Sequence, residues 1–337
     1  MQIDTIHVIE RSHHHVLYTR IPDYRREHLH QAQTVEKSIF EYWAHALAYL
    51  PTADLRYFVR DMRQFRPRPN PHLKPVTAEE IRSMVARIRR NGPLTIRDFD
   101  EEVLIVNGDG WMSRKPSKRV LQLAFIKGLL TISARTGIVK TYELLTRHFR
   151  WQRLPPAAGI TETGNYLLER ALRSQGLVSL ESACYMDAPR KPLVRRLIDA
   201  RVRRKELVPV DFPGMGKLQH WAQPQVLETR ADDSGEQVHI LSPFDPLIIQ
   251  RKRLQLFFDY QHLFEAYVPK EKRVLGYFAC PVLVGAEVVA ALDLKTDRER
   301  NRLLIQKWTW VGKGAARLHR RKIEEELSRF ERFQLAR

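Results

Sequence analysis

Apolar residues recur at helical spacing in residues 77–92, TAEEIRSMVARIRRNG. The apolar positions are Ile81, Met84, Val85 and Ile88. Thr77 and Glu80 have the spacing of a capping box, and Gly92 follows the last apolar turn. The stretch therefore predicts an amphipathic helix with a marked start and a marked end.

The residues after this helix predict a small module. PLTIRDF (93–99) is typical of a short strand entering a new helix, and SKRVLQLAFIKG (117–128) of a helix that ends at its glycine. Two β-rich runs, 129–135 and 138–144, are joined by Thr-Gly, which is a hairpin signal. Helices closed by a hairpin follow the winged-helix plan, although other small α+β units share this pattern.

The pattern returns further along the chain. Residues 161–180 predict a helix that ends in glycine, residues 191–206 a second helix, and residues 207–214 a strand and a turn. A Lys-Pro pair begins the second helix of each unit, at 115–116 and 191–192. Two similar units favour tandem modules.

The last third of the chain is rich in β-type sequence. A polar break at 230–237 precedes three apolar runs, 238–248, 273–296 and 301–310. A final basic helix is expected, with Leu318, Ile323, Leu327 and Phe330 as its apolar positions. The fold class expected is α+β: tandem winged-helix (helix-turn-helix) modules followed by a β-rich C-terminal domain.

Four parts are expected along the chain. The stretch RPRPNPHLKP, at 66–75, has four prolines and reads as a linker. The parts are 1–75, the remnant of a first winged-helix module; 76–152, a second module; 153–230, a third module; and 236–337, the β-rich domain with its terminal helix.

Charge narrows the choice of partner. The chain has 337 residues, with 57 Lys and Arg against 39 Asp and Glu, a formal net charge of +18. Such an excess favours a polyanion as the partner, and nucleic acid is favoured over a membrane because no stretch approaches ~18 apolar residues.

Without a signal peptide, a cytoplasmic protein is expected. The two cysteines, Cys184 and Cys280, are interpreted as inert core thiols.

The candidate chemistry lies at the start of the chain. Gln2 and Asp4 are two residues apart, so an extended strand would place both side chains on one face, with Ile3 behind them. A carboxylate beside an amide could handle a water molecule: the Asp accepts a proton or stabilises positive charge, and the Gln orients the water. By itself the triplet is common, and a surface strand end remains the alternative.

Histidines raise two further questions. Consecutive residues cannot easily bind one ion, so the three histidines at 13–15 are interpreted as a DNA-facing patch rather than a metal site.

EYWAHALAYLP (41–51) is interpreted as a helix, in which His45 lies one turn from Glu41. His45 is thus a candidate catalytic residue, and a core position is the alternative.

Basic residues gather at the predicted second helix of each module. We interpret them as contacts to the phosphates of DNA, with solvated surface as the alternative. These residues are Arg114, Lys115, Lys118 and Arg119 in the module at 76–152 and Arg190, Lys191, Arg195 and Arg196 in the module at 153–230. No sequence motif for nucleotide hydrolysis, dinucleotide binding or zinc is present, so neither a metal nor a cofactor is expected.

Several stretches carry a family resemblance. QIDTIHVIERSHHHVLYTRIPDY, EYWAHALAYLP, LSPFDPLIIQRKR and YVPKEKRVLGYFACPVLVGAEVVAALDLKTDR resemble, in the same order, the winged-helix DNA glycosylases of the YcaQ/AlkZ type. The resemblance runs from residue 2 to about 310. The Q-Φ-D motif at 2–4 is similar to the YcaQ branch, whereas the AlkZ branch has Q-Φ-Q.

The resemblance implies removal of alkylated bases, chiefly N7-alkylpurines, and unhooking of interstrand crosslinks in double-stranded DNA. Asp4 would stabilise the sugar cation and activate water, which Gln2 would orient. It implies a monofunctional enzyme without metal or cofactor, and we expect it to act as a monomer in the cytoplasm, on the nucleoid. Family members have helices before the motif, and this chain is expected to lack them because Met1 precedes Gln2.

Two other functions remain open. Tandem winged helices could serve a transcriptional regulator or a damage sensor without catalysis, and a regulator would prefer one DNA sequence. A nuclease is the weaker alternative, because it normally needs a carboxylate cluster for Mg²⁺.

Overall fold

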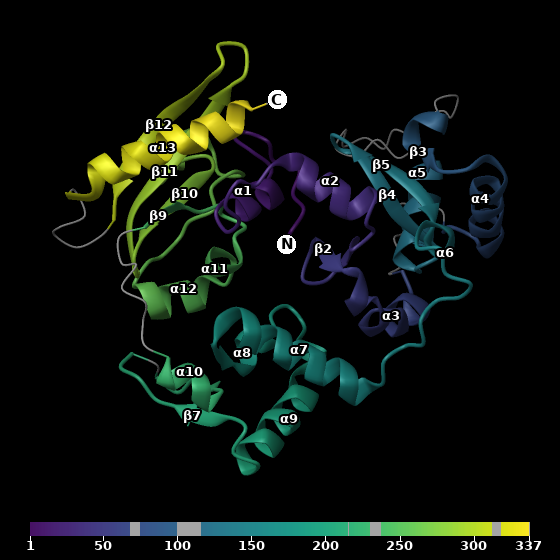
Figure 1. Ribbon diagram of the computed structural model, residues 1–337, viewed down its shortest axis with the longest axis horizontal. Coiled ribbons are helices and arrows are strands. Elements are labelled where there is room, and N and C mark those ends of the chain that lie inside the picture. The colour runs from purple at the N-terminus through teal and green to yellow at the C-terminus, as the bar shows by residue number, and fades with distance from the viewer. Residues whose placement is uncertain (68–74, 100–115, 215, 230–236, 312–317, 337) are drawn as a thin grey trace. The chain divides into compact units, whose positions relative to one another are not determined.

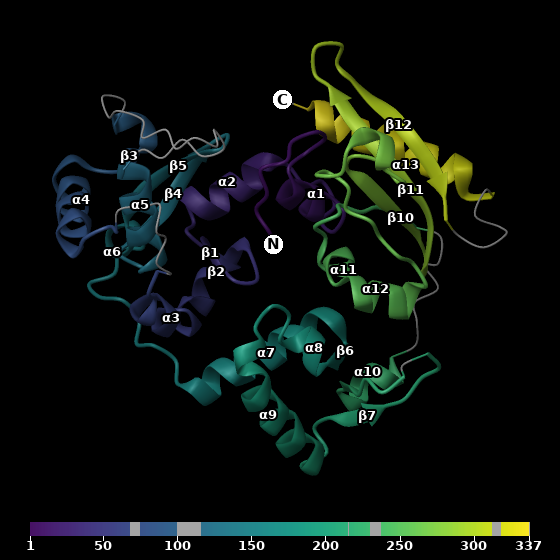
Figure 2. The ribbon, with the colours of Figure 1, turned by 180° about the vertical axis from the view of Figure 1, so that it is seen from behind.

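The structure is a computed structural model that describes residues 1–67, 75–99, 116–214, 216–229, 237–311 and 318–336. The chain divides into two compact units: Met1–Tyr24 with Gly164–Arg337, and Arg25–Thr163. Helices and strands are mixed in both, which confirms the α+β class (Figures 1 and 2). Among the described residues, no helix is long and apolar enough to cross a membrane.

The unit Arg25–Thr163 begins with a helix and a hairpin. These elements are α2 (Arg26–Thr34), β1 (Ile39–Trp43), β2 (Leu47–Pro51), η1 (Thr52–Tyr57) and α3 (Val59–Gln64). The predicted helix at 41–51 is wrong, because β1 and β2 pair as an antiparallel hairpin. The ring of Tyr42 packs on Phe58 and Phe125, and its hydroxyl donates to the carbonyl oxygen of Ile126 at 2.5 Å. These long-range contacts outweigh the helical preference of the alanines.

The rest of this unit forms a three-stranded sheet in the order β3-β5-β4, packed with helices. The elements are α4 (Ala78–Asn91), β3 (Leu94–Thr95), η2 (Ile96–Phe99), α5 (Pro116–Ile126), β4 (Leu130–Thr136), β5 (Val139–Leu144) and α6 (Leu145–His148). The predicted capping box is confirmed: Glu80 N donates to Thr77 Oγ1 at 3.1 Å and Thr77 N to Glu80 Oε2 at 2.6 Å. The predicted hairpin is β4–β5.

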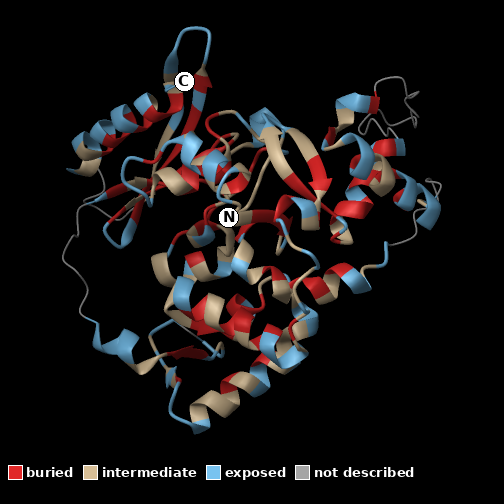
Figure 3. Ribbon diagram, turned by 45° about the vertical axis from the view of Figure 1, so that its right-hand side comes forward, coloured by how far each residue is buried: buried red, intermediate tan, exposed pale blue. Residues whose placement is uncertain are grey.

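The other unit contains a module with the same element order and a sheet in the order β6-β8-β7. Its elements are α7 (Ile160–Gln175), β6 (Leu177–Ser179), α8 (Leu180–Ala183), η3 (Ala188–Arg190), α9 (Lys191–Arg203), β7 (Val208–Val210), β8 (His220–Ala222) and α10 (Pro224–Glu228). The helix predicted within 161–180 is confirmed as far as Gln175, before residues 177–179 form β6, and the helix predicted at 191–206 is confirmed as α9. Leu168, Val178 and Ile198 are fully buried in the module's core. Figure 3 shows that buried and exposed positions alternate along the helices and strands.

The C-terminal part is an antiparallel sheet in the order β12-β11-β10-β9, with α13 contacting β9 and β12. The elements are β9 (Val238–Ile240), α11 (Pro246–Ile249), α12 (Arg251–Phe258), η4 (Lys270–Lys272), β10 (Ala279–Val284), β11 (Glu287–Asp297), β12 (Arg302–Trp310) and α13 (Arg320–Leu335). Ile323, Leu327 and Phe330 are buried on α13, as predicted. Leu318, expected on the same face, lies before the helix and is 82% exposed.

Candidate active site

Gln2 and Asp4 lie in an irregular segment that precedes α1 (Ser12–Tyr18). Gln2 makes one isolated bridge, and residues 3–11, all of which the structure describes, form neither a strand nor a helix. The expected regular strand is therefore wrong. Both side chains are half-buried, so they are partly shielded from solvent.

The Asp4 carboxylate has a defined environment. Its Oδ1 accepts the backbone N–H of Ile6 at 2.7 Å, and Arg11 Nη1 lies 3.5 Å from the carbonyl oxygen of Asp4. Burial raises the pKa of Asp4 above its ordinary value, and the bond from Ile6 and the charge of Arg11 oppose this shift only in part. A carboxylate with a raised pKa is a better base for a proton of water.

The C-terminal sheet holds the segment in place. The backbone N–H of Thr296 donates to the carbonyl oxygen of Val8 at 2.9 Å, and Arg298 Nη2 donates to that of Ile9 at 2.8 Å. Ile9 is fully buried. Thus residues at the end of β11 fix the backbone only a few positions after Asp4.

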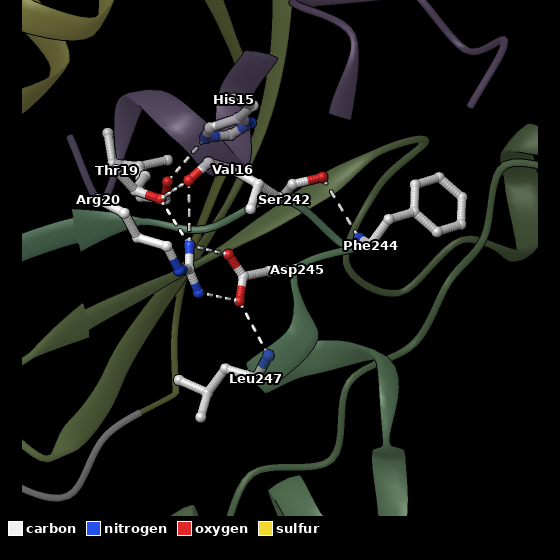
Figure 4. Close-up of polar contacts among 9 residues, drawn as sticks. His15, Val16, Thr19, Arg20, Ser242, Phe244, Asp245 and Leu247 are labelled. Carbon is white, nitrogen blue, oxygen red and sulfur yellow. Dashed lines mark hydrogen bonds and ion pairs between the residues drawn. The ribbon is translucent and has the colours of Figure 1, made fainter. Parts of the chain in front are cut away.

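Helix α1 is anchored to the same unit (Figure 4). Arg20 makes a bidentate ion pair with Asp245, with distances of 2.6 and 2.7 Å, and the Asp245 side chain is fully buried. Asp245 Oδ1 also accepts the N–H of Leu247 at the start of α11. His15 Nε2 donates to the carbonyl oxygen of Ile240 at 2.7 Å. These bonds connect α1 with residues more than 200 positions away.

The three histidines at 13–15 do not form a DNA-facing patch. This corrects the interpretation made from the sequence. His13 and His15 are 4% and 0% exposed, and the half-buried His14 bonds the hydroxyl of Tyr24 through Nδ1 at 2.7 Å. Burial lowers the pKa of His15 to about 4, so its ring is neutral at physiological pH. The His15 ring lies 4.5 Å from that of Phe330 on α13.

A second carboxylate lies close to Asp4 in the chain, and the sequence reasoning missed it. Glu10 is 5% exposed; its Oε1 accepts the N–H of Arg11 at 2.7 Å and lies 3.6 Å from His7 Nε2. A charged residue directly after the apolar pair Val8-Ile9 was the only signal for it.

His45 lies in the turn of the β1–β2 hairpin, in the other compact unit from Gln2 and Asp4. The predicted spacing to Glu41 on a helix does not exist. Glu41, whose side chain is fully buried, instead pairs with Arg135 at 2.6 and 2.7 Å.

The predicted DNA-binding residues of the module at 76–152 are only partly described. Arg114 and Lys115 lie outside the described residues. Lys118 is exposed and Arg119 half-buried in the first turns of α5.

In the module at 153–230, acidic neighbours pair with the predicted cations. Arg190 pairs with Asp187 at 2.6 Å. Lys191 pairs with Glu181 at 3.2 Å, and Arg195 with Asp199 at 2.9 Å. Arg196 is exposed on α9. Part of the positive charge at this helix is therefore neutralised within the module.

No metal site emerges among the residues that the structure describes: no three His, Cys, Asp or Glu side chains gather as a group that could bind an ion. Cys184 and Cys280 are buried free thiols, and burial raises the pKa of Cys184 to about 11. The prediction of inert core thiols is confirmed.

Comparison with known proteins identifies the family. A family model described as "DNA glycosylase AlkZ-like" matches residues 1–333. The chain belongs to the AlkZ-like DNA glycosylase family. The solved structure of Streptomyces sahachiroi DNA glycosylase AlkZ is similar, with a TM-score of 0.54 and 17% sequence identity over 92% of this chain and 82% of that chain. This likeness shows a shared fold, and membership of the AlkZ-like family supports a DNA-repair glycosylase.

Proposed function

We propose that this AlkZ-like protein hydrolyses the N-glycosidic bond of alkylated bases in double-stranded DNA, chiefly N7-alkylpurines, and unhooks interstrand crosslinks. Its Q-Φ-D motif at 2–4 supports placement in the YcaQ-like branch. In this proposal the protein is a monofunctional enzyme that acts as a monomer in the cytoplasm, on the nucleoid, without a metal or cofactor.

Gln2 and Asp4 carry the proposed chemistry. The bond between C1′ and the base nitrogen breaks, its electron pair leaves with the base, and positive charge develops on the sugar. An N7-alkylated guanine already carries positive charge, so it departs without much help from a general acid. The Asp4 carboxylate stabilises the sugar cation and takes a proton from the water that attacks C1′, and the Gln2 amide orients this water.

The observation that carries the proposal is the environment of Asp4. Its carboxyl is half-buried, has a raised pKa and is bonded to the N–H of Ile6. Thr296 and Arg298 immobilise the backbone nearby. A preorganised charge in a partly shielded site stabilises a developing cation more than a freely moving one.

The repeated modules support the proposed mode of DNA binding. In both, the order is helix, strand, one or two short helices, long helix and hairpin, and the first strand pairs with the last strand of the hairpin. This order supports the winged-helix plan that we propose for both modules. We propose that two such modules, together with a helix and hairpin at 26–51, bind the duplex mainly through its phosphates.

The test is the variant Asp4→Asn. Excision of N7-methylguanine from a duplex should fall by about a hundredfold or more, since one preorganised charged group is lost. Duplex affinity should not fall, because the change removes a negative charge. Gln2→Ala should cost less, because other donors can partly position the water. Excision by Asp4→Asn at the wild-type rate would contradict the proposal.

His45 is a third candidate, and the variant His45→Ala decides its role. A large loss of excision at an unchanged melting temperature would place His45 in the site. A lower melting temperature with the excision rate retained would assign it a structural role in the β1–β2 turn.

The second candidate function is a DNA-binding protein without catalysis, favoured by the repeated modules and the net charge of +18. Binding titrations separate the two. A regulator prefers one sequence strongly, whereas a glycosylase binds duplexes of different sequence similarly and with steep salt dependence.

A further inference from the structure

An exposed loop precedes β10 in the C-terminal part of the chain. The loop, residues 266–274 with the sequence AYVPKEKRV, contains η4. Tyr267 is 78% exposed and Val274 is 58% exposed. Lys270 and Lys272 are also exposed. Large apolar side chains and cations therefore share one short surface loop.

Two buried carboxylates clamp the backbone at the end of this loop. Glu265 accepts the N–H groups of residues 274, 275 and 276 at 2.7, 2.6 and 3.1 Å. Asp293 accepts those of residues 277 and 278 at 2.9 and 3.0 Å. Five successive backbone N–H groups thus donate to two side chains that are 5% and 8% exposed.

Close packing adds to this clamp. Gly276 has φ +135°, and a Cβ atom there would lie 2.4 Å from side-chain atoms of Asp293, so another residue would not fit without movement. Burial acts to raise the pKa of Glu265, but the three backbone N–H groups outweigh it and hold this pKa below its usual value. The carboxylate is therefore ionised, and its bonds are charge-assisted.

Two cationic side chains donate hydrogen bonds to backbone carbonyl oxygens of the loop. Arg273 Nε donates to the carbonyl oxygen of Val268 at 2.7 Å, and its guanidinium lies over the ring of Tyr277 at 5.0 Å. Lys307 Nζ on β12 donates to the carbonyl oxygen of Val274 at 2.6 Å. The loop is thus held at both ends while Tyr267 faces solvent.

We propose that the 266–274 loop is a preorganised contact for duplex DNA, in which Lys270 and Lys272 bind phosphates and Tyr267 packs against a sugar or base edge. A protein that binds a polyanion gains affinity from cations whose backbone is already ordered, because less conformational entropy is lost on binding. An exposed aromatic ring beside cations suits duplex DNA, which presents apolar sugar faces next to charged phosphates. The inference rests on the proposed action on DNA.

The first test measures affinity for an undamaged duplex over a range of salt concentrations. The double variant Lys270→Ala/Lys272→Ala should bind about tenfold more weakly at low salt, and the slope of log K against log[salt] should decrease by roughly 1.8. The matched control is Arg320→Ala/Arg321→Ala, which also removes two cations, from exposed pairs on α13. An equal loss in both double variants would overturn the proposal, because it would reflect net charge alone.

The second test separates loop order from charge. Glu265→Gln removes a negative charge, so electrostatics alone predicts tighter DNA binding, whereas loss of the clamp predicts weaker binding by about threefold. If a folded Glu265→Gln protein binds DNA as tightly as the wild type or more tightly, the clamp does not contribute to DNA binding. If this variant does not fold, Tyr267→Ala decides: affinity should fall about threefold with an unchanged salt slope, and Tyr267→Phe should restore most of it.

Excision separates this inference from the proposed function. At sub-saturating protein, single-turnover excision by the loop variants should fall by the same factor as their duplex affinity, because the proposed contact acts through binding. A wild-type protein that binds duplex but excises nothing would contradict the proposed function and leave the loop intact as a DNA contact. Wild-type affinity in all loop variants would overturn the inference and assign the loop to another partner, such as an acidic protein surface.

Discussion

The segment at 1–11 and the module from Gly164 in α7 to β8 belong to one compact unit but are stabilised in different ways. The module has regular helices and its own buried core, in which Leu168 and Ile198 are fully buried. The segment has no regular structure beyond one bridge, and bonds from Thr296 and Arg298 hold its backbone. The candidate chemistry therefore depends on a few polar contacts, whereas the module depends on many apolar ones.

Because of this difference, we expect substitutions in the two regions to have different kinds of effect. Loss of one contact to the segment should change excision or stability strongly, because Thr296 and Arg298 each hold the backbone at residues 8 and 9 through one hydrogen bond. Exposed substitutions on the modules should change DNA binding by small, roughly additive steps.

The largest effect is expected at the ion pair behind α1. Arg20→Ala leaves the fully buried Asp245 carboxylate without its cation, which should cost about 3 kcal/mol in the free energy of unfolding. Asp245→Asn should cost less, because the Arg20 side chain is 42% exposed and can be hydrated. Urea unfolding measures both. As a control, Arg204→Ala, in an exposed pair with Glu206, should leave stability unchanged, and an equal loss there would contradict the comparison.

The next effect concerns Arg298, which donates to the carbonyl oxygen of Ile9. Arg298→Ala should lower the excision rate about tenfold through displacement of the segment, and duplex affinity should change much less. Single-turnover kinetics gives the rate, and Arg298→Lys should restore part of it. A loss confined to affinity would instead place Arg298 among the DNA contacts.

A smaller effect compares the two modules. Lys118→Ala, at an exposed position on α5, should weaken binding to any duplex about threefold and lower the salt slope by roughly 0.9. Lys191→Ala should have less than half that effect on affinity, since Glu181 already pairs with this lysine. Fluorescence anisotropy at several salt concentrations measures both. Equal effects would show that the ion pair does not reduce the contribution of Lys191.

The smallest effect is a shift in the pH profile of excision. The ionised form of Asp4 is the active one, so activity should rise with pH through a pKa above the ordinary 3.8. The charge of Arg11 opposes the rise of this pKa, so Arg11→Ala should move the acid limb to higher pH by roughly a few tenths of a unit. If the acid limb of the pH profile is unchanged in Arg11→Ala, a group other than Asp4 titrates. The same conclusion follows if Asp4→Asn keeps the acid limb of the wild type.

Much of the regular structure could be predicted from local pattern. The capping box of α4, the glycines after α5 and α7, and the β4–β5 hairpin follow from neighbouring residues. The sequence of 41–51 was misread as a helix because its alanines favour one, while the contacts of Tyr42 with Phe58 and Phe125 favour the hairpin.

The candidate site was predicted only as residue types. The spacing of Gln2 and Asp4 and the motifs around them led to the family, which the match over residues 1–333 shows. Nothing near them in the chain indicated that Arg298, Thr296 or Asp245 would hold the segment and the following helix.

The sequence by itself determined the family, the α+β class and the helices and hairpins with marked ends, because their signals act over a few neighbouring residues. The tertiary structure decided the burial of His15, the internal pairing of Lys191 and the clamp on the 266–274 loop. Each depends on which distant residues the folded chain brings within hydrogen-bonding distance. The raised pKa of Asp4 likewise arises from burial, a property that residue spacing does not encode.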